Sequence, residues 1–213
     1  MRGCFITFEG CDGSGKSTQI QAIARELRES GVPVLLTREP GGTPFGEMVR
    51  DMLLDPAGPE RGALAEFLMY AASRAELVRS VIAPALREDK VVLVERFTDS
   101  SIVYQGYAGG IPIPDIENIN KVATDDLVPD LTLVFDVCDP EIFRERLAPK
   151  HKDKIELRDD SYHAKVRQGY RELQLLYPGR IKLIDGTLPK EEVFKAAMAE
   201  VRRVLGDKRR ETL

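Results

Sequence analysis

The stretch Phe5–Thr18, FITFEGCDGSGKST, determines how the rest of this 213-residue chain is interpreted. It opens with Phe5–Phe8, a run of apolar and β-branched residues that is typical of a short strand. Gly10–Ser17 then matches the phosphate-loop pattern G-x-x-x-x-G-K-S at every fixed position. Apolar residues at helical spacing follow between positions 20 and 27. This order of strand, loop and helix favours a nucleotide-phosphate site over a glycine-rich turn that merely precedes a helix.

The loop has the composition that polyphosphate binding requires. Glycines let the backbone wrap closely around phosphate oxygens, and the N-terminus of the following helix adds partial positive charge. We expect Lys16 to face solvent and neutralise β and γ oxygens, and Ser17 to ligate Mg²⁺. The loop residues expected to surround the polyphosphate are Gly10, Cys11, Asp12, Gly13, Ser14, Gly15, Lys16, Ser17 and Thr18.

Composition indicates one α/β domain spanning residues 1–213, because 43% hydrophobic residues suffice for a single core. A formal net charge of −4 gives no global basic field, so we expect no nucleic-acid and no membrane partner. Three widely spaced cysteines form no C-x-x-C pair, which suits a reducing compartment. With no apolar signal segment at the N-terminus and no long apolar run, these features predict a cytoplasmic protein.

Strand and helix patterns alternate along the whole chain. The segments expected to form strands are 5–8, 33–37, 90–95, 131–136 and 181–184. We expect a long helix over Ala63–Arg87, bent near Pro84, and a last helix over Lys190–Leu205 that ends at Gly206. This alternation predicts a five-stranded parallel sheet with helices on both faces. Ligands of such sheets bind beyond the carboxyl ends of the strands.

Charged residues follow two of the predicted strands. Glu95 closes a buried apolar run and resembles a Walker B acid that supports Mg²⁺, and Arg96 beside it would clamp a phosphoryl group. A surface ion pair is the alternative interpretation of this dipeptide. Arg38 begins a glycine-rich loop after the second strand and is placed either to grip a second phosphate or simply to be solvated.

Two further features are weaker. Tyr70 and Arg74 share a helix face, where an aromatic ring and a guanidinium could stack on a base and bond its edge, although a core tyrosine with a surface arginine fits equally. Residues 148–156 carry Lys150, Lys152 and Lys154 and suggest a lid that closes over phosphates; a solvated charged surface is the alternative.

Several segments, taken together and in order, resemble the thymidylate kinase family. They are FEGCDGSGKST at 8–18, TREPGGT at 37–43, LMYAASRAEL at 68–77, ERFTDSSIVYQG at 95–106 and DPEIFRERL at 139–147, with weaker similarity at 185–187. This family transfers the γ-phosphoryl group of ATP to dTMP with Mg²⁺, and its members are usually homodimers. The resemblance therefore implies this activity, these cofactors, a homodimer and the architecture of a P-loop nucleoside monophosphate kinase with a lid segment.

The resemblance also implies residue roles. On the donor side, Lys16 and Ser17 serve the ATP phosphates and the metal, and Arg146 lies near the adenine. Asp12 lies near the deoxyribose 3′-hydroxyl. On the acceptor side, Arg38 and Arg96 hold the dTMP phosphate. The remaining acceptor residues are Tyr70 stacked on the base, Arg74, Ser101 and Gln105 at its edge, and Tyr104 beneath the deoxyribose.

Two positions depart from the family pattern. The family's motif after the third strand usually begins with Asp, whereas this chain has Glu95, and Lys154 stands where bacterial members often have Arg. The predicted catalytic residues are Lys16, Arg96, Glu95 and Lys154. Because lysine lacks the two-pronged guanidinium of arginine, the sequence leaves open which lid residue contacts the transferred phosphoryl group.

Two other functions are alternatives to this interpretation. A GTP-binding switch would need N-K-x-D, but the nearest string, Asn120–Ala123, ends in Ala. A kinase for another nucleoside or nucleotide is left open by sequence.

Overall fold

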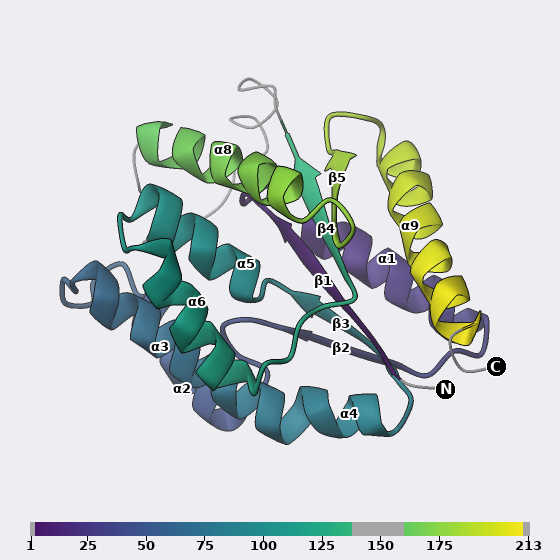
Figure 1. Cartoon of the computed structure of the whole chain (residues 1–213), viewed down its shortest axis with the longest axis horizontal. Coiled ribbons are helices and arrows are strands. Elements are labelled where there is room, and N and C mark those ends of the chain that lie inside the picture. The colour runs from purple at the N-terminus through teal and green to yellow at the C-terminus, as the bar shows by residue number, and fades with distance from the viewer. Residues whose placement is uncertain (1–2, 138–159, 211–213) are drawn as a thin grey trace.

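The computed structural model of the chain describes residues 3–137 and 160–210. Its strands are β1 (Cys4–Gly10), β2 (Val34–Arg38), β3 (Val91–Glu95), β4 (Leu131–Asp136) and β5 (Ile181–Asp185). Every neighbouring pair is parallel and the order across the sheet is β2-β3-β1-β4-β5 (Figure 1). The predicted five-stranded parallel sheet is therefore confirmed.

Helices connect the strands. They are α1 (Lys16–Glu29), α2 (Pro44–Leu54), α3 (Ala63–Leu77), η1 (Val78–Ile82), α4 (Ala83–Arg87), α5 (Thr98–Ser101), η2 (Ile102–Ala108), α6 (Ile113–Thr124), α8 (Asp160–Leu176) and α9 (Lys190–Arg210). No helix in the described part of the chain is long and apolar enough to cross a membrane.

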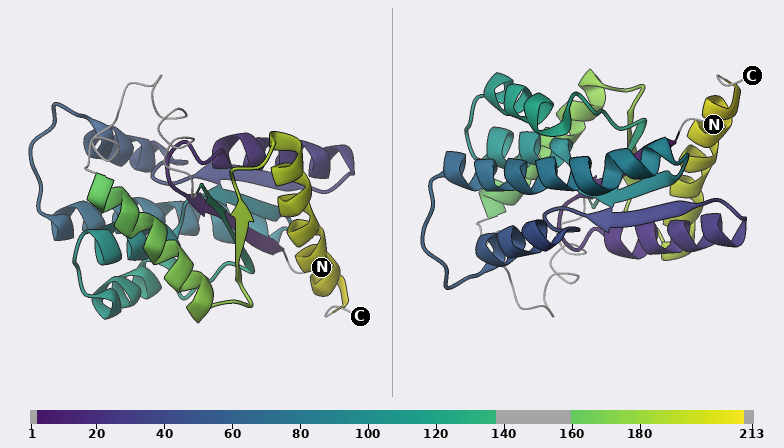
Figure 2. Two further views of the ribbon diagram at one scale, coloured as in Figure 1. Left: turned by 90° about the horizontal axis from the view of Figure 1, so that it is seen from above. Right: turned by 90° about the horizontal axis from the view of Figure 1, so that it is seen from below.

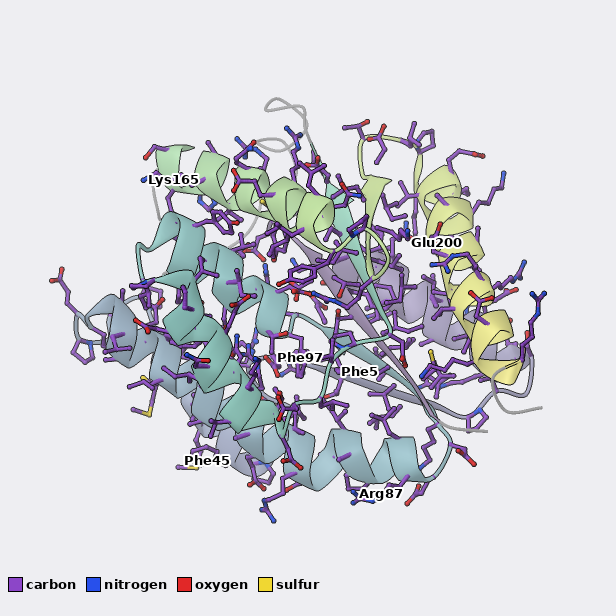
Figure 3. The ribbon with its side chains drawn as sticks, viewed as in Figure 1. Phe5, Phe45, Arg87, Phe97, Lys165 and Glu200 are labelled. Atoms are coloured by element: carbon purple, nitrogen blue, oxygen red, sulfur yellow. The ribbon has the colours of Figure 1, made fainter. Side chains whose placement is uncertain are left out.

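The sheet is buried between two helical layers (Figure 2). Alternate residues of β1 serve opposite faces, as the pleat requires. Ile6 and Phe8 pack against α1 and α9, whereas Phe5 packs against η1 and α4 on the other side. Figure 3 shows Phe5 beside Phe97 in the interior, and their rings meet edge to face at 4.9 Å. Helices therefore cover both faces, as the sequence predicts.

One helical expectation is confirmed and one is corrected. The predicted segment Ala63–Arg87 is helical throughout, and its π-helical part, η1, ends two residues before Pro84. Proline has no N–H and its ring crowds the carbonyl four residues earlier, so a regular α-helical ladder cannot continue through it. The last helix does not end at Gly206 but runs to Arg210, and contacts near its end include an ion pair from Lys208 to Asp130 at 2.7 Å.

Several expectations lie outside the described residues. They concern the lid at 148–156, with Lys154 and its neighbouring lysines, and Arg146.

Candidate active site

The site lies where three strands end side by side. In the parallel register Phe8 of β1 and Arg38 of β2 both align with Glu95 of β3. The loop after β1, the loop after β2 and the turn after β3 therefore leave the sheet at the same edge. This is the position at which open parallel sheets bind ligands.

The loop after β1 leads directly into α1. Gly15 is the N-cap residue, with a left-handed conformation at φ 90°, and it provides no side-chain cap. A helix begun in this way leaves its first N–H groups for an external acceptor, which together with the helix dipole makes an anion site. Gly10 is also required, because a Cβ there would collide with the carbonyl of Phe135.

Lys16 is not the solvent-facing residue that the sequence predicts, since only 4% of it is exposed. Its ammonium donates to the Cys11 carbonyl at 3.3 Å and to Asp12 Oδ1 at 3.2 Å, and it lies 4.0 Å from Glu95 Oε1. The physical reason is that two carboxylates and a carbonyl replace its hydration shell. Lys16 thus lies at the centre of the predicted catalytic residues.

Arg96 has an unusual backbone and well-defined partners. Its φ of 65° is in the left-handed region, which a residue with a side chain adopts at some cost. The guanidinium donates to Asp12 Oδ1 at 2.6 Å and lies 5.0 Å from the ring centre of Tyr104. Burial opposes ionisation of Asp12, but the charges of Arg96 and Lys16 prevail and hold its pKa well below the usual range. The pair is therefore ionised.

Every residue predicted to bind the acceptor lines one cavity. Its walls come from the loop after β1, from β2 and its loop, from α2, and from the α3 and η2 helices. The lining residues are Asp12, Arg38, Glu39, Pro40, Arg50, Leu54, Tyr70, Arg74, Glu95, Arg96, Ser100, Ser101, Tyr104 and Gln105.

Arg74 is fixed in the wall of this cavity rather than lying at the surface. It is 1% exposed and forms an ion pair with Glu39 at 2.7 Å. It also donates to Asn120 Oδ1 at 2.6 Å and to the Ser101 hydroxyl at 3.1 Å. A guanidinium held by so many acceptors has one orientation, as recognition of a planar base edge requires. The alternative of a surface arginine is wrong.

Arg38 and Tyr104 differ in burial. Arg38 has a half-exposed side chain that pairs with Glu47 at 2.9 Å. Because exposed pairs are weak, this guanidinium is available to an incoming anion. Tyr104 is buried, with its ring edge-on to Tyr162 and Tyr170, and burial raises the pKa of its hydroxyl well above the ordinary value. It therefore forms a rigid, neutral floor.

A second cavity is joined to the first through Lys16, which lines the second and contacts Asp12 and Glu95 in the wall of the first. It is lined by the phosphate loop, the start of α1 and the segment between β5 and α9. These residues are Gly13, Ser14, Gly15, Lys16, Ser17, Thr18, Gln19, Gly186, Leu188, Lys190 and Val193. Gly10 and Cys11, although predicted to bind here, are not among the described lining residues, and Asp12 lines the first cavity instead.

The predicted metal ligands are adjacent and have suitable chemistry. The Ser17 hydroxyl donates to Glu95 Oε1 at 2.7 Å, so a hydroxyl and a carboxylate oxygen lie side by side between the two cavities. Within residues 3–137 and 160–210, no cluster of three or more His, Cys, Asp or Glu is arranged to hold a metal alone. Mg²⁺ typically uses one or two protein ligands together with phosphates and water, so Ser17 and Glu95 fit this ion.

Several lining residues are not predicted from sequence. Glu39 and Ser100 lie within the quoted motifs without a predicted role, and Arg50 lies on α2, which has no motif. Arg50 donates to the Pro40 carbonyl at 3.0 Å, so it also shapes the loop after β2. A lone arginine on a helix gives no sequence signal, because its role depends on a loop that only the folded structure brings against it.

The chain is similar to known proteins over most of its length. The sequence model described as "Thymidylate kinase" matches residues 8–197. The chain is 47% identical over 201 residues to a thymidylate kinase of Symbiobacterium thermophilum, covering 94% of both chains. It is also 47% identical over 203 residues to that of Pelotomaculum thermopropionicum, covering 92% of this chain and 94% of the relative.

A solved structure is similar throughout. The crystal structure of thymidylate kinase from Ehrlichia chaffeensis superposes with a TM-score of 0.77 at 34% identity, covering 94% of this chain and 99% of the other. Its fold matches the parallel sheet and flanking helices described above. With a matching family model over most of its length and relatives at this level of identity, the chain belongs to the thymidylate kinase family.

Proposed function

We propose that this protein transfers the γ-phosphoryl group of ATP to dTMP, with Mg²⁺, as a homodimer in the cytoplasm. The observation that carries the proposal is the pair of adjoining cavities, one at the phosphate loop and one lined by every predicted acceptor residue. Contacts among Asp12, Lys16, Ser17 and Glu95 link the two. The names of the relatives support dTMP as the acceptor.

The residues between the cavities offset the negative charge of the donor and acceptor phosphates, which must approach each other for transfer. The loop N–H groups and Lys16 hold the donor phosphates, and Arg38 and Arg96 hold the acceptor phosphate. Transfer builds negative charge on oxygens that these cations already face, and preorganised charges stabilise such a transition state. Mg²⁺ held by Ser17 and Glu95 would neutralise further charge on the donor oxygens.

Base and sugar choice follow from the rigid part of the acceptor cavity. Tyr70 supplies a face for stacking, while Arg74, Ser101 and Gln105 offer hydrogen bonds to a pyrimidine edge. The buried ring of Tyr104 packs on two further tyrosines, so it cannot move aside. A ribose 2′-hydroxyl placed against this ring would therefore clash with it. A deoxypyrimidine monophosphate is therefore the preferred acceptor.

A coupled assay of ADP release tests this assignment. Purified protein with ATP and Mg²⁺ is offered dTMP, dUMP, UMP, dCMP, AMP and dGMP in turn, with a Lys16→Ala preparation as the blank. We expect the highest kcat/KM for dTMP and a lower value for each ribonucleotide. Faster turnover of another monophosphate would replace dTMP as the substrate, and no ADP release with any of them would overturn the kinase assignment.

A further inference from the structure

A buried carboxylate, Glu9, lies directly behind the acceptor phosphate site. It belongs to β1 and is 0% exposed. It is not among the described residues that line either cavity, so it is placed to contact neither substrate. Burial and the charge of Asp99 raise its pKa, while Arg96 and two hydroxyl donors oppose that shift. A carboxylate kept in such a position must satisfy its oxygens within the protein.

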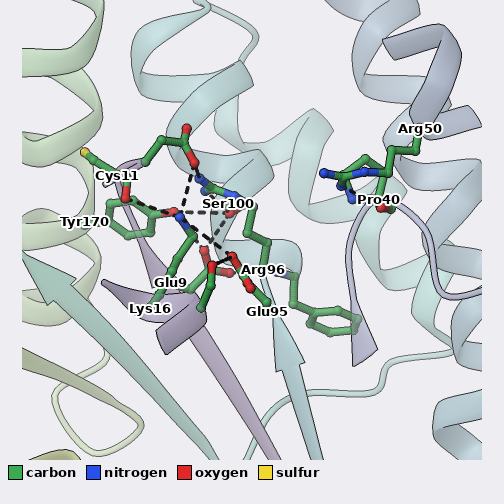
Figure 4. Close-up of polar contacts among 12 residues, drawn as sticks. Glu9, Cys11, Lys16, Pro40, Arg50, Glu95, Arg96, Ser100 and Tyr170 are labelled. Carbon is green, nitrogen blue, oxygen red and sulfur yellow. Dashed lines mark hydrogen bonds and ion pairs between the residues drawn. The ribbon is translucent and has the colours of Figure 1, made fainter. Parts of the chain in front are cut away.

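Glu9 bonds to the turn that carries Arg96 at two points. Its Oε1 accepts the backbone N–H of Phe97 at 2.8 Å, and its Oε2 accepts the Ser100 hydroxyl at 2.6 Å. Arg96 in turn donates from Nη1 to the same Ser100 oxygen at 3.3 Å. The carboxylate therefore holds both the peptide that follows Arg96 and a hydroxyl that its guanidinium uses (Figure 4).

These bonds act on a residue that does not hold its conformation unaided. The left-handed φ of Arg96 is unfavourable for a residue with a Cβ and persists only where the surroundings determine it. The Arg96 N–H donates to the Phe8 carbonyl at 3.0 Å, which fixes one side of the turn to β1. Glu9, the next residue of β1, fixes the other side. Both anchors are needed to direct the guanidinium onto Asp12.

The third donor to Glu9 comes from a distant helix. Tyr170 of α8 donates its hydroxyl to Glu9 Oε2 at 2.8 Å, and its ring centre lies 6.4 Å from that of Tyr104. The same hydroxyl lies 3.2 Å from the Ser100 oxygen. Tyr170 thus joins α8 to the carboxylate and to the Arg96 turn in one network.

We propose that Glu9 is a positioning residue for Arg96, and that Tyr170 couples the docking of α8 to the position of that arginine. The inference rests on the proposed function in that Arg96 is taken to hold the acceptor phosphate. Binding of the acceptor therefore depends on how α8 is seated, although α8 contributes none of the described residues that line the acceptor cavity.

Two variants and a matched control test the proposal. Tyr170→Phe removes the hydroxyl but keeps the ring that packs on Tyr104, and Glu9→Gln keeps the size of the side chain but removes its charge. The control is Tyr162→Phe, on the same helix and also against Tyr104, whose buried hydroxyl donates to the Tyr104 carbonyl at 3.0 Å instead of to Glu9. All three are compared with the wild type for kcat and for the KM of each substrate.

We expect the KM for dTMP to rise about tenfold in Tyr170→Phe and Glu9→Gln, because each loses a hydrogen bond to a charged group. The KM for ATP stays within about twofold, since the phosphate loop is untouched. Tyr162→Phe keeps both values. The proposal is contradicted if Tyr170→Phe and Tyr162→Phe raise the KM for dTMP equally. It is also contradicted if the KM values for dTMP and ATP rise in parallel, because Glu9 and Tyr170 would then have only a structural role.

Calorimetric titration without turnover separates this inference from the proposed function. Each protein is titrated with dTMP and with inorganic phosphate, because the inference concerns the arginine and not the base. Weaker binding of inorganic phosphate by Tyr170→Phe than by Tyr162→Phe supports the coupling, whatever the wild type does with dTMP. Failure of the wild type to bind dTMP would overturn only the assignment of dTMP as the substrate. Equal binding of both probes by these two variants overturns the coupling.

Discussion

Lys16 is buried among groups that it stabilises, so its removal affects both chemistry and fold. Lys16→Ala takes away the cation that faces the donor phosphates and leaves Asp12 and Glu95 without it. We expect kcat to fall by about 10²–10³, the usual effect of deleting one preorganised donor. Lys90→Ala is the control, since its ammonium pairs with Glu88 at the surface. Turnover near the wild-type value in Lys16→Ala would contradict the central role of this lysine.

Asp12 makes stability depend on pH in a defined direction. Because its folded pKa is depressed, the ionised carboxylate stabilises the native state above the ordinary aspartate pKa of about 4, and this contribution is lost as the pH falls further. We expect Asp12→Asn to be less stable than wild type by about 1–3 kcal/mol at neutral pH. Urea unfolding between pH 7 and pH 3 checks this. A stability difference that does not shrink below pH 4 would contradict the ion pairing.

Residues within one loop were predictable from sequence, whereas their long-range partners were not. The spacing from Gly10 to Ser17 is local, so the phosphate loop could be identified before any fold was known. Glu9 and Tyr170 are 161 positions apart, and neither shows a pattern that would pair them. The burial of Lys16 also depends on Glu95, a residue brought to it only by strand pairing.

At the scale of elements, the stability of α2 depends on its N-cap residue, Thr43. The Thr43 hydroxyl accepts the N–H of Gly46 at 2.9 Å, and Glu47 in the same turn accepts the N–H of Gly42 at 2.8 Å. We expect Thr43→Ala to lower the free energy of unfolding by about 1 kcal/mol, and Thr43→Ser to retain most of it. Urea unfolding with an unchanged m-value is the measurement. Equal stability of the alanine and serine variants would show that the cap contributes nothing.

Element types were predicted better than element ends. The sheet strands were recognisable because parallel strands buried on both faces read as continuous apolar runs. The end of α9 was misplaced because Gly206 is a common stop signal, yet Arg203 pairs with Asp207 across it at 3.3 Å. The π-helical η2 has no sequence signature of its own, and its packing partner α8 lies far along the chain.

At the scale of the whole molecule, α2 and α3 expose an apolar surface. Phe45, Met48 and Met52 recur at three- and four-residue spacing on α2, and Leu64 and Leu68 are exposed on α3. Such a face on a helix pair is suited to covering by a second copy of the chain. We expect the double variant Met48→Lys, Met52→Lys to shift the protein from two chains to one in light scattering. Leu175→Lys, an exposed apolar position on α8, is the control, and a dimer that survives the double variant would place the interface elsewhere.

The left-handed backbone at Arg96 carries a local conformational cost that the contacts of its side chain must offset. Glycine suits this conformation better than any residue with a Cβ, so Arg96→Gly should be more stable than Arg96→Ala by about 1 kcal/mol, although both lack the cation. Chemical unfolding of the two variants measures the difference, and an alanine variant of equal stability would show that the backbone carries no strain. Among replacements that remove the cation, a screen for heat resistance is therefore expected to enrich glycine over alanine, whereas the ion pair with Asp12 favours keeping the arginine.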